Sequence, residues 1–209
     1  MNLSAPPQAL EPYLRQRSKT KPPGTQAANQ LRIIAGKHRG RKLSFADLPG
    51  LRPSGDRLRE TLFNWLAPHI VGAHCLDLYT GSGALALEAV SREASSVIAL
   101  DKAPEVINTL RQHANTLNAM ELALHQADAN IWLGEPADQA CDIVFIDPPF
   151  DHNLWQTTID LLGQGAWLAD GAVVYIESRR DSQYTVPAHW HLHREKKAGQ
   201  VLARLYHCT

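Results

Sequence analysis

The chain has 209 residues, of which 44% are hydrophobic, so it is long enough for one globular domain with its own core and a short appendage. No apolar run approaches the length of a membrane span, and residues 1–10 lack the charged start and apolar stretch of a signal peptide. Three widely spaced cysteines form neither a disulfide framework nor a CxxC metal pair, which favours a cytoplasmic protein without membrane contact or metal site.

A net charge of zero hides an uneven distribution along the chain. Residues 1–60 hold 12 Lys/Arg and 4 Asp/Glu, a balance of +8, whereas residues 61–209 hold 9 and 17, a balance of −8. Such asymmetry indicates a segment that binds nucleic acid, joined to a domain that has a different function. The alternative is a solvated surface that is basic without binding anything.

The first 66 residues divide into a tail and a small structured unit. Residues 1–30 are rich in Pro, Gln and Ala without periodicity, so we expect a basic, mostly disordered tail. Two apolar-bearing segments, 31–35 and 41–45, flank a basic tip between glycines, which predicts a β-hairpin. Ser54 is a suitable N-cap for a helix that reaches Leu66.

From residue 67 to 209, predicted strands and helices alternate, which is typical of an open, mostly parallel sheet covered on both faces. The last two strands instead predict an antiparallel hairpin, so the expected sheet has seven strands. The predicted strands are 75–79, 96–101, 122–126, 141–147, 172–177, 189–196 and 200–207, and the predicted helices are 84–92, 104–118 and 153–162.

A glycine-rich turn follows the first of these strands. Asp77 ends the strand, and Gly81, Gly83 and Ala86 form a G-x-G-x-x-A pattern, which dinucleotide-binding folds share. A carboxylate at the strand end would repel a pyrophosphate, but it suits a ligand that carries an ammonium and a sulfonium. The glycines allow the backbone to approach such a ligand closely. S-adenosylmethionine has these cations together with a ribose and an adenine.

The next two strands also lead to aspartates. Asp101 is placed to accept hydrogen bonds from ribose hydroxyls, and Asp128 could receive the adenine amino group. Each aspartate alone is also compatible with a helix cap or a solvated turn.

The fourth strand ends in Asp147, Pro148, Pro149 and Phe150. Two prolines cannot continue a central strand, so the backbone turns outward and the carbonyls of Asp147 and Pro148 become acceptors beside a flat ring. Acceptors beside a ring suit a planar base that bears an exocyclic amine. For Phe150, the alternative is a core aromatic that caps the strand.

These residues together resemble the class I S-adenosylmethionine-dependent methyltransferases, and Asp-Pro-Pro-Phe resembles the motif of those that act on exocyclic amino nitrogens. More closely, the chain resembles the bacterial 16S rRNA guanine-N2 methyltransferases. The resemblance covers about residues 31–207 and includes the blocks 32–36, 39–43 and 51–66.

The resemblance implies a Rossmann-like α/β fold preceded by a small basic hairpin. It implies that Asp77, Gly81 and Gly83 surround the methionine part of S-adenosylmethionine, that Asp101 holds the ribose and that Asp128 lies near the adenine. Asp147, Pro148 and Phe150 would hold the target base, and Pro149 belongs to the same motif. Tyr79 is expected beside the cofactor or in an ordinary buried position. Ala127 stands where relatives often have glycine, a departure that bears on Asp128.

The basic block is expected to bind phosphates of small-subunit rRNA, naked or in an assembled subunit, with a monomer as the default state. Some of these residues could instead pair with the acidic main domain. The predicted phosphate contacts are Lys37, Arg39, Arg41, Lys42, Arg52, Arg57 and Arg59. Two other functions remain open: a DNA adenine-N6 methyltransferase, and a ribosome-assembly factor that binds S-adenosylmethionine without catalysis.

Overall fold

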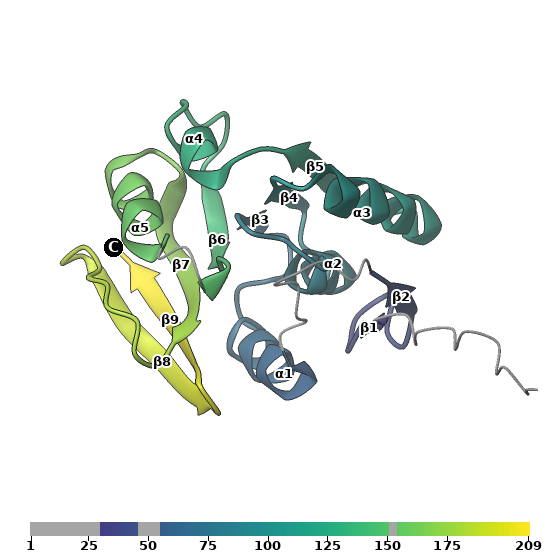
Figure 1. Ribbon diagram of the computed structural model, residues 1–209, viewed down its shortest axis with the longest axis horizontal. Helices are drawn as coiled ribbons and strands as arrows, with labels where there is room; N and C mark the ends of the chain where they lie inside the picture. The colour runs from purple at the N-terminus through teal and green to yellow at the C-terminus, as the bar shows by residue number, and fades with distance from the viewer. Residues whose placement is uncertain (1–29, 46–54, 151–153) are drawn as a thin grey trace, which may run out of the picture.

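The computed structural model describes residues 30–45, 55–150 and 154–209, and its centre is a seven-stranded sheet (Figure 1). The strand order is β5-β4-β3-β6-β7-β9-β8. Strands β3 to β7 are parallel to their neighbours, whereas β9 runs antiparallel to β7 and to β8. The predicted parallel sheet with a C-terminal antiparallel hairpin is therefore confirmed. The strands are β3 His74–Asp77, β4 Ser96–Asp101, β5 Leu122–Gln126, β6 Cys141–Ile146, β7 Leu168–Arg179, β8 Trp190–Ala198 and β9 Val201–Cys208.

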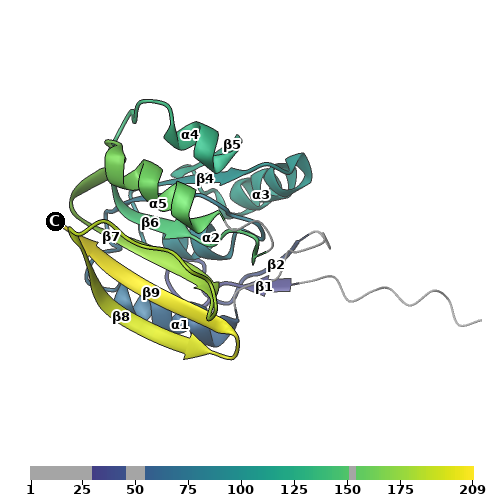
Figure 2. The same ribbon diagram turned by 60° about the vertical axis from the view of Figure 1, so that its left-hand side comes forward.

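Helices cover both faces of this sheet (Figure 2), which explains why its central strands are apolar throughout. One face packs against α1, α2 and α3 and the other against α4 and α5, so that the core has two layers. The helices are α1 Asp56–Trp65, α2 Ala84–Ser91, α3 Pro104–Leu117, α4 Ala129–Leu133 and α5 Trp155–Gln164. Within the described residues, no helix is both long enough and apolar enough to cross a membrane.

The parallel strands all run in one direction, so their ends form two opposite edges of the sheet. We call the edge where β3, β4, β5, β6 and β7 end the carboxyl edge, and the opposite edge the amino edge. Helix α2 starts at the carboxyl edge and ends, at Ser91, near the amino edge, where Glu121 introduces β5. In open sheets of this kind, ligands bind at the carboxyl edge.

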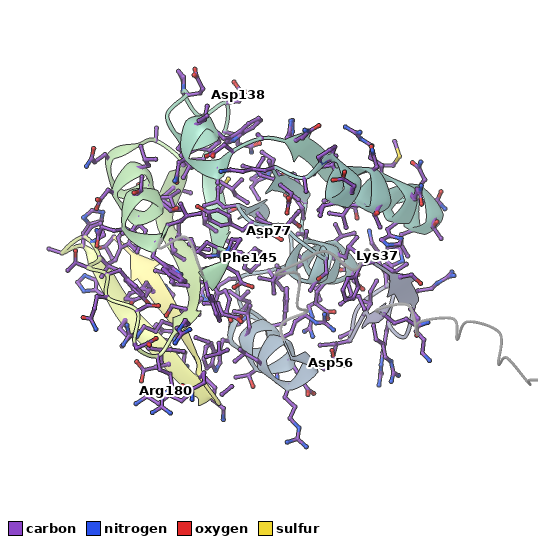
Figure 3. All side chains as sticks on the ribbon, viewed as in Figure 1. Lys37, Asp56, Asp77, Asp138, Phe145 and Arg180 are labelled. Atoms are coloured by element: carbon purple, nitrogen blue, oxygen red, sulfur yellow. The ribbon has the colours of Figure 1, made fainter. Side chains whose placement is uncertain are left out.

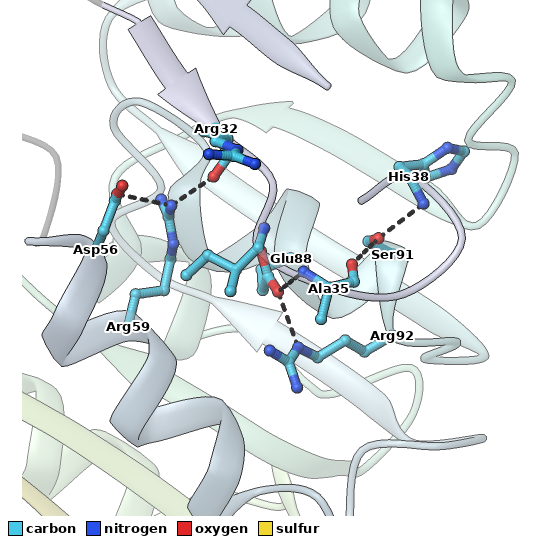
Figure 4. Close-up of polar contacts among 9 residues, drawn as sticks. Arg32, Ala35, His38, Asp56, Arg59, Glu88, Ser91 and Arg92 are labelled. Atoms are coloured by element: carbon cyan, nitrogen blue, oxygen red, sulfur yellow. Dashed lines mark hydrogen bonds and ion pairs between the residues drawn. The ribbon is translucent and has the colours of Figure 1, made fainter. Parts of the chain in front are cut away.

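The N-terminal hairpin, β1 Gln30–Arg32 and β2 Lys42–Ser44, forms a separate two-stranded sheet that packs against α2 (Figure 4). The buried carboxylate of Glu88 accepts the backbone N–H groups of Ile34 and Ala35 at 2.8 and 3.0 Å and also binds Arg92. Gly36 has a φ of +78°, and a Cβ at this position would lie 1.7 Å from the backbone oxygen of Ser91. Glycine is therefore required where the hairpin meets the end of α2.

Three local predictions differ from the structure. The N-cap of α1 is Gly55, and Ser54 lies outside the described residues, as do residues 1–29 of the predicted tail. Helix α4, which the sequence analysis missed, has only five residues and starts at the Asp128 cap. Strand β7 begins at Leu168, earlier than predicted, and its pairing with β6 is irregular between the pairs Cys141/Leu168 and Ile143/Val173.

Candidate active site at the carboxyl edge

The end of β3 places a carboxylate in the protein interior. Asp77 is 1% exposed, and neither of its side-chain oxygens has a hydrogen-bond partner within the described residues. The hydroxyl of Thr80 and the backbone N–H groups of Tyr79 and Ala86 face this carboxylate and favour its charge, but none reaches it with hydrogen-bond geometry. Burial outweighs them and raises the pKa of Asp77 to about 7. A buried carboxylate without a partner is costly, and a cationic ligand would compensate it.

The glycine-rich turn passes directly over this carboxylate and is fixed to β4. Gly81 and Gly83 have φ values of +49° and +78°, a conformation that residues with a side chain rarely adopt. The N–H of Gly81 donates to Asp101 at 3.0 Å. At Gly83, an added Cβ would lie 2.3 Å from Leu110 of α3. A larger residue at position 83 would therefore force the Leu110 side chain to shift, and the close backbone approach to a ligand that we predicted for Gly83 stays a prediction.

Asp101 ends β4 and lies at the carboxyl edge beside Asp77. Its two oxygens accept the N–H groups of Gly81 and Ala103, at 3.0 and 2.8 Å. Each carboxylate oxygen has a second acceptor position, so these bonds orient the group and leave acceptor capacity for a ribose hydroxyl.

Asp128 follows β5 and is the N-cap of α4. It caps α4 by accepting the N–H groups of Asn130 and Ile131, at 2.8 and 3.2 Å. Its other oxygen forms an ion pair with Lys102, which lowers the pKa of Asp128. The adenine contact that we predicted for Asp128 therefore stays a prediction. Lys102 lies beside Asp128 through their ion pair.

Tyr79 is half-buried and belongs to a polar network between the two helices of one face. Its hydroxyl lies 2.6 Å from that of Thr158 on α5, and the Thr158 hydroxyl lies 3.0 Å from the Asn130 side chain on α4. Thr158 is fully buried. The network connects Tyr79, which follows β3, to α4 and α5, and sequence patterns gave no signal for Thr158 or Asn130.

The backbone leaves the sheet at Asp147, one residue after β6 ends. Pro148 is buried and Pro149 is exposed, as expected for a chain that turns outward. The ring of Phe150 is half-buried and packs against Trp155, with centroids 6.0 Å apart and an interplanar angle of 39°. One side of the Phe150 ring therefore contacts the hydrophobic core, while the ring remains partly exposed to solvent.

Strand pairing brings a further carboxylate to Asp147. Ile146, the last residue of β6, pairs with Ile176 of β7, so the residues that follow them, Asp147 and Glu177, lie next to each other. Glu177 is buried and accepts the hydroxyl of Tyr175 at 2.8 Å. Burial, followed by the charges of Glu177 and Asp147, raises the pKa of Tyr175 well above its ordinary value. Sequence analysis left Glu177 unassigned because only the register reveals this neighbour.

The predicted phosphate-binding residues separate into three groups. Arg39, Arg41, Lys42 and Arg57 are exposed, which is compatible with the prediction, and Arg52 lies outside the described residues. Lys37 is exposed but forms an ion pair with Glu121, and its backbone N–H donates to Ser91. The hairpin tip therefore lies at the amino edge, away from Asp147.

Arg59 is a correction to the sequence prediction. Its side chain is 0% exposed and donates to the Arg32 carbonyl at 2.6 Å and to Asp56 at 3.0 Å (Figure 4). Its Nε and Nη1 atoms have no hydrogen-bond partner within the described residues, and burial lowers its pKa. Arg59 connects the hairpin to α1 and cannot contact a phosphate in this arrangement.

The site as a whole fits S-adenosylmethionine. The predictions that Asp77, Gly81 and Gly83 surround the methionine part of the ligand and that Asp101 binds the ribose are compatible with this geometry, because Asp77 offers a buried carboxylate to the ammonium and Asp101 keeps acceptor capacity. Asp147 directly follows β6, which is the neighbour of the strand that ends in Asp77, because β3 pairs with β6. No group of three metal-ligating side chains capable of holding an ion occurs among residues 30–45, 55–150 and 154–209. The fold and this site define a class I S-adenosylmethionine-dependent methyltransferase.

Comparisons with known proteins agree with this class. The family model described as "Conserved hypothetical protein 95" matches residues 31–207. The chain is 49% identical over 187 residues to the Ribosomal RNA small subunit methyltransferase D of Escherichia coli strain K12, covering 89% of this chain and 94% of that relative. This protein belongs to the Conserved hypothetical protein 95 family.

Solved structures show the same fold. The Escherichia coli protein yhhF superposes with a TM-score of 0.80 at 49% identity, over 86% of this chain and 98% of that one. An RNA methyltransferase from Salinibacter ruber, solved with S-adenosyl-L-homocysteine, has a TM-score of 0.58 at 14% identity, over 75% and 94%. At that identity, the second likeness concerns the fold alone.

Proposed function

We propose that this protein transfers a methyl group from S-adenosylmethionine to the exocyclic N2 of a guanine in small-subunit rRNA, in the cytoplasm. The observation that carries the proposal is the pairing of β3 with β6, which sets the unpartnered Asp77 carboxylate beside the strand that leads to Asp147. The 49% identical relative is named a small-subunit rRNA methyltransferase, which supports RNA as the substrate.

The chemical difficulty lies in the target amine. The lone pair of guanine N2 is delocalised into the ring, so the amine is a poor nucleophile. The two N–H groups of the amine would donate hydrogen bonds to the Asp147 carboxylate and the Pro148 carbonyl. These hydrogen bonds would favour a pyramidal nitrogen and stabilise the positive charge that develops on it. Phe150 would stack on the base, and the Trp155 contact holds its ring in place.

The remaining contribution is positioning. S-adenosylmethionine would supply the methyl group: the N–CH3 bond forms as the S–CH3 bond breaks, the neutral thioether S-adenosylhomocysteine leaves, and the methylated amine loses one proton. Asp77 and Asp101 would hold this donor in one orientation, so that the amine approaches in line at about 3–3.5 Å. A paired or stacked guanine must first be turned out of its helix. The exposed cations Arg39, Arg41 and Lys42 would bind RNA phosphates away from the base-binding residues Asp147, Pro148 and Phe150.

The test uses purified protein, labelled S-adenosylmethionine, small subunits from cells that lack the protein, and identification of the methylated nucleoside. We expect N2-methylguanosine with the unmodified protein, and a rate about 10²–10³ lower for Asp147→Ala, the usual loss for one stabilising group in a transition state. Asp147→Asn retains one acceptor oxygen and should be less impaired. Asp138→Ala is the control, because Asp138 is exposed and far from Asp77 (Figure 3).

Other outcomes contradict the proposal in distinct ways. Methylation of an adenine, in RNA or DNA, would favour the adenine-N6 alternative. Normal donor binding by calorimetry without transfer to any subunit preparation would favour a non-catalytic assembly factor. Near-normal transfer by Asp147→Ala would refute the assigned mechanism.

A further inference from the structure

A second basic segment is hidden in the acidic main domain. Residues 179–204 hold six Lys/Arg and two Asp/Glu, a balance of +4. Residues 61–178 hold three Lys/Arg and 15 Asp/Glu, a balance of −12. The overall balance of −8 for residues 61–209 therefore averages two surfaces of opposite sign.

The topology brings this segment to the carboxyl edge. Strand β7 continues for three residues after Ile176, the last residue that pairs with β6, and ends at Arg179 opposite Val201 of β9. The turn between β8 and β9 lies next to this end, since Ala198 also pairs with Val201. Figure 1 shows the β8–β9 hairpin extending past the end of β6. We call residues 179–204 the C-terminal arm.

Three cations of the arm have no ion-pair partner among the described residues and are exposed: Arg180, Arg194 and Lys196. The other three are engaged in ion pairs. Arg179 binds Asp181, while Lys197 and Arg204 share Glu195. The arm thus keeps positive charge available on its surface after its own acidic residues are satisfied.

Strand pairing places these charges with respect to the site. Glu177 pairs with Ala203, and Ala203 pairs with Lys196, so the three residues form one row across β7, β9 and β8. Side chains in such a row point to the same face of the sheet. Lys196 is therefore two strands away from the carboxylate that neighbours Asp147, on an edge strand with no further neighbour.

The two basic regions lie on different sides of the site. In Figure 3, Lys37 and Arg180 are at opposite sides of the molecule, and Asp77 lies between them. An RNA that presents a base to the carboxyl edge would meet the arm next to the site, whereas the hairpin tip lies farther away, at the amino edge.

We propose that the C-terminal arm is a second RNA-docking surface, which binds phosphates flanking the target guanine through Arg180, Arg194 and Lys196. The proposal rests on the proposed function, since it assigns the arm to the same substrate. Charge complementarity identifies the partner: a polyanion already has to reach the carboxyl edge, and the arm is the positively charged part of an otherwise acidic domain.

The experiment measures equilibrium binding of small-subunit rRNA by fluorescence anisotropy, without methyl donor, between about 50 and 200 mM salt. The test variant combines Arg180→Gln and Lys196→Gln. We expect about tenfold weaker binding and a salt dependence lower by about two phosphate contacts. The control is Arg111→Glu, which changes the net charge by the same amount on the exposed surface of α3. It should change affinity less than about twofold.

Calorimetry with S-adenosylmethionine shows that each variant is folded and retains the donor site. If the test variant binds rRNA as tightly as the unmodified protein, the RNA-docking role of the C-terminal arm is refuted, and the proposed function is unaffected. Equal losses in the test variant and in the Arg111→Glu control would also overturn it, because net charge alone would then explain the effect. Failure of the unmodified protein to bind rRNA would overturn both proposals.

Discussion

The buried carboxylate of Asp77 makes the stability of the donor-free protein depend on pH. Its pKa is about 7 in the folded protein, compared with an ordinary value of 3.8. Because the folded state holds the proton more tightly, the stabilisation is fully present below pH 3.8 and is lost as pH rises through about 7. The full difference corresponds to about 4 kcal/mol.

Asp77→Asn removes this titration while preserving the shape of the side chain. Between pH 5 and pH 8, the unmodified protein should lose about 2.5 kcal/mol more stability than the variant. This is a substantial share of the 5–15 kcal/mol that is typical of a domain. The variant should also lose donor binding, since the amide offers no charge to an ammonium.

The measurement is urea denaturation of both proteins at several pH values, with and without S-adenosylmethionine. We expect the two pH profiles to diverge as the pH rises above about 4 in the donor-free state. S-adenosylmethionine should restore stability at pH 7 to 8 only in the unmodified protein. Parallel pH profiles would show that Asp77 is not the titrating group, and equal stabilisation of both proteins would refute its contact with the donor.

Three further predictions concern the hairpin and the base slot. Glu88→Ala should cost about 3–5 kcal/mol in urea denaturation, because it leaves two backbone N–H groups and a guanidinium without their acceptor; a cost below 1 kcal/mol would contradict this role. Gly36→Ala and Gly40→Ala place a side chain at similar φ values of +78° and +83°, but only the first meets backbone atoms. Gly40→Ala should cost about 1–2 kcal/mol, and Gly36→Ala more, with faster amide exchange in the hairpin; equal costs would refute the clash. Phe150→Ala should lower the efficiency of methyl transfer about ten- to a hundredfold, the equivalent of a lost base stack, with donor binding unchanged by calorimetry.

Sequence patterns predicted the sheet because its signals are local. The apolar runs that become β4 and β5 have the predicted bounds, Ser96–Asp101 and Leu122–Gln126. Acidic residues at strand ends identified the carboxyl edge, since parallel strands must end there together. Helix α4 was missed because five residues carry too little periodicity, and its start depends on the Asp128 side chain.

The sequence predicted charges less well, because a residue type does not reveal its burial. Arg59 was expected at a phosphate and is buried beneath the hairpin. Lys37 was predicted to bind RNA phosphates; it is exposed, and its ion pair with Glu121, 84 positions later in the chain, places it at the amino edge. The C-terminal arm was overlooked because its charge was averaged with that of the acidic strand ends. Counting charges over shorter windows would have revealed it.

The identity of the modified nucleotide tests the account most directly. Small-subunit rRNA from cells that lack this protein would be digested and mapped by mass spectrometry, then compared with rRNA from cells that express the protein or its Asp147→Ala variant. We predict one guanosine that loses its N2-methyl group without the protein, regains it with the unmodified chain and fails to regain it with the variant. An unchanged N2-methylguanosine map, or restoration by the variant, would contradict the account.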